Sequence, residues 1–115
     1  ESIKWEPLPA KKDYLESVKP ALLDIRRPEE YAAGHLENSV LMDYYAPDFK
    51  DNLAKLDKSA KYLIYCRSGH RSGLTLAMMK DFAFTDIHDI AGGINAWIAA
   101  GLPVVKSRYS VTGTA

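Results

Sequence analysis

Short apolar segments that alternate with helix signals constrain the fold of this chain more than any other feature. Four such segments have the length of a strand: residues 21–26, 39–42, 61–65 and 86–90. Parallel strands need a crossover connection, usually a helix, so this alternation favours a parallel sheet covered on both faces. We therefore predict an α/β fold with helices on both sides of the sheet. In such sheets, ligands bind outside the carboxyl ends of the strands.

Helix signals occupy the intervening segments. Helices are predicted over 13–19, from Pro28 to just before Gly34, over 48–57, from Ser72 onward, and within 92–103. Pro28 suits a first helical position and Gly34 a stop. Apolar spacing predicts the buried faces of the last two helices, which are Leu74, Ala77 and Met78 in one and Ile94, Trp97 and Ile98 in the other.

Length and charge indicate one ordinary globular domain. We expect it to span all 115 residues, with 1–12 as an irregular lead-in and 106–115 as a C-terminal tail. The formal net charge is zero, so no overall basic field attracts nucleic acid or an anionic membrane. No apolar segment approaches the roughly 20 residues of a membrane helix. We expect no nucleic-acid partner, no membrane partner and a cytoplasmic location.

Cys66 is the only cysteine, so the chain forms no internal disulfide. One cysteine with His35, His70 and His88 scattered along the chain does not make a zinc site. We therefore expect neither a metal nor a cofactor.

The segment "CRSGHRS", residues 66–72, joins the predicted strand 61–65 to the following helix. Unpaired backbone N–H groups at the start of a helix attract an anion, and loop amides add to this effect. Gly69 permits a tight path, while Arg67 and Arg71 bring permanent positive charge. Each factor favours the thiolate of Cys66, so this side chain is predicted to be a nucleophile.

Two other interpretations of Cys66 were weighed. A lone cysteine is most often a small buried hydrophobe, but the polar neighbours from Arg67 to Ser72 argue against full burial here and favour a reactive role. Cysteine-dependent phosphatases place an arginine one position later than Arg71, where this chain has Ser72. A loop that is one residue short suits a persulfide sulfur better than a phosphate.

Three stretches, in order, make the chain resemble the rhodanese-homology domain family of sulfurtransferases. They are "LLDIRRPEEYAAGHLENSV" at 22–40, "CRSGHRS" at 66–72 and "IAGGINAWIAAGLPV" at 90–104. The resemblance covers about residues 13–105. It implies a three-layer fold with a parallel sheet of about five strands between helices.

The resemblance also implies a reaction. Cys66 would take a sulfane sulfur from an anionic donor such as thiosulfate, form a persulfide without a cofactor, and pass the sulfur to cyanide or a thiol. The loop residues Arg67, Ser68, Gly69, His70, Arg71 and Ser72 would bind the substrate and the persulfide. A protein donor or acceptor is a further possible partner.

Asp24 and Arg26 match the family's aspartate-x-arginine pattern. They would brace the active-site loop from a neighbouring strand end, or else form a surface ion pair that contributes little. His35 matches a glycine–histidine pair for which we expect a structural hydrogen bond.

The chain departs from the family pattern at two places. Ala83 stands where the family usually has glycine, which costs on the order of 1 kcal/mol if the turn is left-handed. Tyr44 and Tyr45 stand where many members have small residues, and they would narrow the site or contact a partner. A sulfur-carrier module and a non-catalytic interaction module of a larger pathway protein remain alternatives to the enzyme, and a cysteine-dependent phosphatase or arsenate reductase is less favoured.

Overall fold

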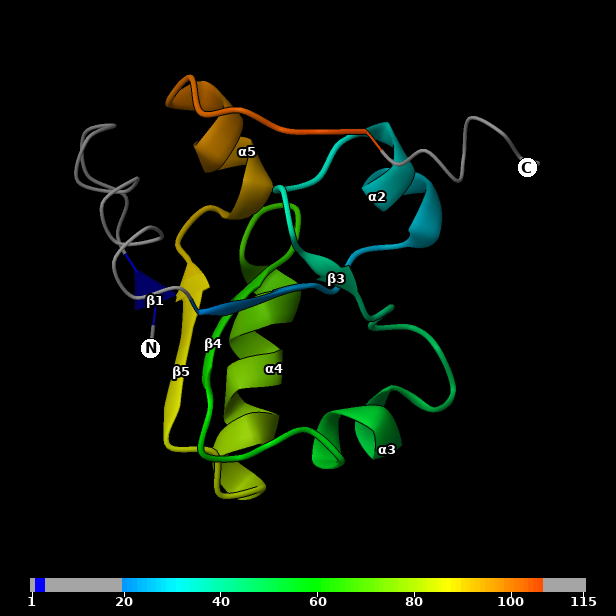
Figure 1. Cartoon of the computed structure of the whole chain (residues 1–115), viewed down its shortest axis with the longest axis vertical. Coiled ribbons are helices and arrows are strands. Elements are labelled where there is room, and N and C mark those ends of the chain that lie inside the picture. Colours follow the sequence, from blue (N-terminus) through cyan, green and yellow to red (C-terminus); the bar gives the residue numbers. More distant parts are fainter. Residues whose placement is uncertain (1, 4–19, 107–115) are drawn as a thin grey trace.

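The computed structural model describes residues 2–3 and 20–106, and it forms one twisted parallel sheet between helices (Figure 1). The five strands lie in the order β1-β5-β4-β2-β3, and every pairing is parallel. Strand β4, which precedes Cys66, is therefore central. The predicted α/β fold with a parallel sheet is confirmed.

The elements follow the predicted alternation. The strands are β1 (Ser2–Ile3), β2 (Ala21–Asp24), β3 (Val40–Leu41), β4 (Lys61–Tyr65) and β5 (Asp86–Ile90). The helices are α2 (Pro28–Ala33), α3 (Phe49–Ala54), α4 (His70–Asp81) and α5 (Gly93–Ala99). The helix predicted over 13–19 lies outside the described residues. Ser2 and Ile3 belong to a strand, so the prediction of an irregular lead-in is wrong for these two residues.

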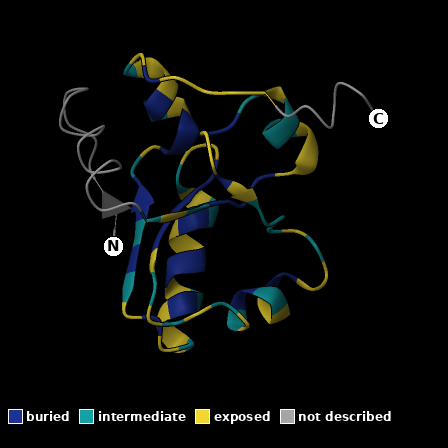
Figure 2. Ribbon diagram, in the orientation of Figure 1, coloured by how far each residue is buried: buried dark blue, intermediate teal, exposed yellow. Residues whose placement is uncertain are grey.

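Both faces of β4 are buried, as a parallel sheet requires. Tyr62 and Ile64 point into a core shared with α3 and α4, whereas Leu63 and Tyr65 point into a second core with α5. Figure 2 shows α4 with its buried face against the sheet and its exposed face outward. This two-sided packing holds the end of β4, and therefore Cys66, in a fixed position.

Three predicted burial patterns are wrong. Segment 39–42 was expected to be a buried strand, but β3 lies at the sheet edge and Val40 is 58% exposed. Helix α4 begins earlier than predicted and buries Ser72, Thr75, Leu76 and Met79. Of the predicted face, Leu74 and Ala77 are exposed, and only Met78 packs half-buried against the core. Ser72 and Thr75 are polar side chains that are buried with hydrogen-bond partners, and a prediction from the spacing of apolar residues does not detect them. Ile98 is 53% exposed.

Helix α4 ends in a left-handed residue, and this residue is Ala83, with φ at 71°. The N–H of Phe84 donates to the Met79 carbonyl and that of Ala83 to the Lys80 carbonyl, the pattern of a Schellman cap. The sequence comparison identified this position as a departure, and the backbone confirms that it needs the left-handed region.

Across residues 2–3 and 20–106, no helix combines the length and apolar character needed to cross a membrane.

Candidate active site

Three polar positions meet at one edge of the sheet because the strands are parallel and in register. Asp24 pairs with Tyr65 across β2 and β4, and Ile64 pairs with Asp89 across β4 and β5. Cys66 directly follows β4, so its backbone lies between these neighbouring strand ends. This is the carboxyl edge at which α/β sheets bind ligands.

Backbone N–H groups converge on the sulfur of Cys66. The amide nitrogen of Gly69 lies 3.1 Å from Sγ and that of Ser72 lies 3.4 Å from it. Gly69, with φ at 107°, makes the turn that aims these donors inward. Cys66 is only 1% exposed, so the expectation that its polar neighbours prevent full burial is wrong, and any reactant must reach the sulfur with a slender group. The converging amides are suited to a thiolate or to a sulfur chain attached to Sγ.

Asp89 is a site residue that the sequence analysis missed. Its Oδ2 accepts a hydrogen bond from the Ser72 hydroxyl at 2.7 Å, and Ser72 Oγ lies 3.6 Å from the sulfur of Cys66. Asp89 is 1% exposed, and its Oδ1 has no hydrogen-bond partner among the described residues. The available signal was an acidic residue one position before the end of a buried strand.

The two loop arginines differ in their surroundings. Arg71 Nη1 lies 3.4 Å from Glu30 Oε1, and the Arg71 guanidinium lies 5.7 Å from the ring centre of Tyr45. Arg67 is exposed, and no carboxylate in the described part of the chain forms an ion pair with it. Arg67 is therefore the loop arginine available to an anionic reactant. Ser68 and His70 are exposed on the loop, while Ser72 is buried.

Glu30 anchors Arg71. Burial alone would raise the pKa of Glu30, but hydrogen bonds from the Arg27 N–H and Arg71, with the charges of Arg71 and Arg26, outweigh it. The pKa of Glu30 is therefore held below its ordinary value, and the side chain is ionised at neutral pH. Both tyrosines were expected beside the site; Tyr45 is exposed and lies against Arg71, whereas Tyr44 packs against the core.

Asp24 and Arg26 form a buried pair, so the interpretation as a surface ion pair is wrong. Arg26 Nη2 lies 2.7 Å from Asp24 Oδ2, and the same nitrogen donates to the Gly34 carbonyl. The Arg26 guanidinium lies 5.7 Å from the ring centre of Tyr65, the residue before Cys66. The pair thus connects the end of β2 to the end of α2 and to the strand that carries the loop.

The start of α5 is held against the loop that begins at Cys66. The N–H of Ile94 donates to the Cys66 carbonyl at 2.9 Å, and that of Asn95 donates to the Arg67 carbonyl at 3.1 Å. A Cβ at Gly93 would lie 2.5 Å from the carbonyl oxygens of Cys66 and Arg67. Only glycine allows this approach, so Gly93, the first residue of α5, is part of the site.

His35 has a structural environment. Its Nδ1 lies 2.8 Å from the Tyr31 carbonyl, its ring stacks on that of Tyr31, and its backbone pairs with Val105. These contacts fit the expected structural hydrogen bond and join α2 to the segment after α5.

Comparison with known proteins agrees with the fold. The family model of the rhodanese-like domain matches residues 9–100. The chain therefore belongs to the rhodanese-like domain family. A rhodanese-related protein from Thermoplasma volcanium is 29% identical and superposes with a TM-score of 0.77, covering 93% of this chain and 99% of that one.

Curated relatives carry several activities. The chain is 36% identical over 87 residues to a probable adenylyltransferase/sulfurtransferase MoeZ of Mycobacterium tuberculosis, 34% identical over 94 residues to a tRNA uridine(34) hydroxylase of Chlamydia trachomatis, and 32% identical over 84 residues to a sulfurtransferase of Allochromatium vinosum. These matches cover 75%, 76% and 73% of this chain. The chain spans only 22% and 28% of the first two relatives, and 77% of the third.

Proposed function

We propose that the protein is a sulfurtransferase that carries a sulfane sulfur as a persulfide on Cys66. The observation that carries this proposal is the pair of amide donors, from Gly69 and Ser72, that face Sγ in the loop. Membership of the rhodanese-like family and the likeness to a sulfurtransferase support it.

In the first step, the Cys66 thiolate attacks the outer sulfur of an anionic donor such as thiosulfate. A bond forms between Sγ and that sulfur, the donor S–S bond breaks, and its electron pair leaves with sulfite. The product is a persulfide anion on Cys66. Arg67, which has no ion-pair partner in the described residues, would hold the sulfite oxygens as they leave.

In the second step, a thiophilic acceptor removes the sulfur. The carbon of cyanide, or the sulfur of a thiolate, attacks the outer sulfur, and the electron pair of the S–S bond returns to Sγ. The amides of Gly69 and Ser72 then face the thiolate again. Each step is a nucleophilic displacement at the outer sulfur, in which the leaving sulfur atom keeps the electron pair of the broken bond. The proposed reaction therefore uses no cofactor.

The orientation of Arg71 disfavours the phosphatase interpretation. Its guanidinium contacts Glu30 and Tyr45 at the rim. An aryl phosphate assay tests this alternative directly, and we expect no turnover.

The sulfur-carrier alternative has one observation in its favour. The chain matches only 22% of the length of the two-activity MoeZ protein, so the same domain occurs inside a longer chain. In that case, the Cys66 persulfide would form but small acceptors would remove the sulfur slowly.

Intact-mass spectrometry tests the proposal. The reduced protein is measured before and after thiosulfate, then after cyanide, beside Cys66→Ser. We expect a gain of one sulfur atom that cyanide removes and that Cys66→Ser lacks. No gain in fully reduced protein would contradict the proposal, and slow removal by cyanide would favour the carrier.

A further inference from the structure

Asp89 is a buried carboxyl group to which the reaction proposed above gives no role. It lies in β5, one residue before the strand ends, and it is 1% exposed. Its Oδ2 lies 2.7 Å from the Ser72 hydroxyl, and its Oδ1 has no hydrogen-bond partner among the described residues. A carboxylate with one bare oxygen is costly to bury, and the addition of a proton would remove its charge.

Ser72 connects this carboxyl group to the reactive sulfur. Sγ of Cys66 lies 3.6 Å from Ser72 Oγ, in a geometry that lets the thiol donate to the hydroxyl oxygen. The Ser72 hydroxyl faces two acceptors, Asp89 Oδ2 at 2.7 Å and the Gly69 carbonyl at 3.2 Å, and the shorter contact is to the acid. The side chains of Cys66, Ser72 and Asp89 therefore form one hydrogen-bonded chain.

This chain can hold a proton at either end. With the proton on the sulfur, the thiol donates to Ser72 and the Ser72 hydroxyl donates to the Asp89 carboxylate. With the proton on Asp89, the acid donates to Ser72 and the Ser72 hydroxyl donates to the thiolate. Both arrangements keep the same pair of contacts and the same total charge. In the second one, the hydroxyl joins the amides of Gly69 and Ser72 as a donor to Sγ.

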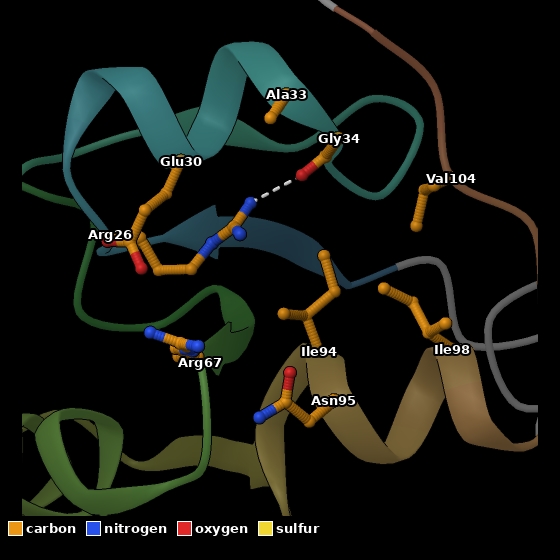
Figure 3. A pocket seen from close by; sticks show the side chains of 9 residues that line it. All are labelled: Arg26, Glu30, Ala33, Gly34, Arg67, Ile94, Asn95, Ile98 and Val104. Atoms are coloured by element: carbon orange, nitrogen blue, oxygen red, sulfur yellow. Dashed lines mark hydrogen bonds between the residues drawn. The ribbon is translucent and has the colours of Figure 1, made fainter.

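Other charged groups near the reactive sulfur have partners elsewhere or are exposed. They are Asp24, Arg26 and Glu30 on the side of β2 and α2, and Arg67, His70 and Arg71 on the loop and α4. Asp24 pairs with Arg26 and Glu30 pairs with Arg71, while His70 is exposed. Figure 3 shows Arg26, Glu30 and Arg67 around a hollow between α2 and α5, and neither Cys66 nor Asp89 lines this hollow.

The remaining elements around the chain bring no charge to Asp89. By sequence, β1, β3 and α5 contain no charged residue or histidine, and the charged residues of α3 are exposed. Tyr65 of β4 belongs to the second core, and His88 of β5 lies 3.2 Å from Asp86. No ion pair in the described part of the chain involves Asp89. The ionisable group that the hydrogen bonds of Asp89 reach is therefore the thiol of Cys66.

We propose that Cys66 and Asp89 share one proton through Ser72, and that Asp89 holds this proton when Cys66 is the nucleophile. The S–H bond breaks and leaves its electron pair on Sγ. That proton binds to Ser72 Oγ, and the original hydroxyl proton of Ser72 moves to Asp89 Oδ2. Asp89 is thus a positioning residue, since it acts on the sulfur through Ser72. Its part in sulfur transfer rests on the function proposed above, whereas the shared proton does not.

The first experiment follows both groups in one pH titration of the whole chain. Ultraviolet absorbance reports the thiolate, which Cys66→Ser lacks. The infrared C=O stretch of a protonated carboxyl group reports Asp89, and Asp89→Asn lacks this band. We expect the wild-type thiolate to appear while the band of protonated Asp89 is still present. Loss of the band before any thiolate appears would overturn the proposal, because Asp89 would then hold no proton when the sulfur is ionised.

The second experiment tests whether the two groups are coupled. Groups that share a proton shift each other's titration by the same amount. Asp89→Asn should therefore lower the midpoint of the last thiolate step by about one pH unit or more, and Cys66→Ser should lower the midpoint for loss of the carboxyl band equally. Thr75→Val is the matched control, because it removes a buried hydroxyl of α4 that donates to the Arg71 carbonyl. The control should leave both midpoints in place, and unmoved midpoints in both test variants would overturn the shared proton.

Persulfide formation separates this proposal from the proposed function. Its rate with thiosulfate is measured by intact mass over the same pH range. The rate should rise in two steps in the wild type and in Thr75→Val, and in one step in Asp89→Asn. Coupled titrations without any persulfide would contradict only the sulfurtransferase function, and a persulfide with uncoupled titrations would contradict only the shared proton.

Discussion

The hydroxyl of Ser72 and the carboxylate of Asp89 lie 2.7 Å apart beneath Cys66, and both residues are at most 1% exposed. They join the first turn of α4 to β5 directly below the reactive sulfur. Asp89 Oδ1 has no hydrogen-bond partner in the described residues. The hydrogen bond from Ser72 to Oδ2 is therefore the one that offsets the free-energy cost of burying this carboxyl group.

Ser72→Ala should therefore destabilise the protein by about 1–3 kcal/mol, because it leaves a buried acceptor without its donor. Denaturant unfolding gives the free-energy change, and adding Asp89→Asn should recover part of it. Ser59→Ala is the matched control, since Ser59 makes a bond of the same length to Asp57 at an exposed position. Equal effects at the two serines would contradict the assigned role of burial.

Ala83→Gly should stabilise the protein by about 1 kcal/mol, because Ala83 sits in the left-handed region at the end of α4. A thermal melt with denaturant unfolding measures the change. The same substitution at Ala77, within α4, should have the opposite sign and a similar size. A loss of stability in Ala83→Gly would show that the cap has no strain to relieve.

Gly93→Ala should disrupt the loop that begins at Cys66, because the added Cβ would lie 2.5 Å from the carbonyl oxygen of Cys66 and the φ of 63° disfavours a side chain. We expect lower stability and a large loss of persulfide formation, measured by unfolding and by intact mass. Gly73→Ala, at a position with open space around it in α4, should keep both. Normal persulfide formation in Gly93→Ala would refute the requirement for close approach.

Glu30→Gln should change the pH dependence of stability. The pKa of Glu30 is lowered in the folded protein, so its contribution is present above the ordinary value of 4.5 and is lost as pH falls through the folded pKa. The wild type should thus be more stable than the variant at pH 7, and the difference should shrink in acid. The free energies of unfolding of both proteins, measured from neutral pH into acid, give this difference. A difference that stays constant with pH would mean that the ion pair between Glu30 and Arg71 does not cause it.

Local patterns in the sequence predicted much of the architecture. Residues 61–65 and 86–90 form strands as expected, and Pro28 begins a helix that ends before Gly34. These features depend on short-range chemistry: proline fixes a backbone angle, and runs of branched and aromatic residues suit a strand. The position of Cys66 at a strand end followed from the same patterns.

The sequence by itself determined the alternation of strands and helices and the position of Cys66 at a strand end, because each depends on neighbours along the chain. The tertiary structure decided which residues meet across the sheet. It brought Asp89 into hydrogen-bond contact with Ser72 and paired Arg71 with Glu30. It also left Arg67 without an ion pair among the described residues and Ile98 exposed to solvent. These relationships join residues far apart in the chain, and strand order and helix packing set them.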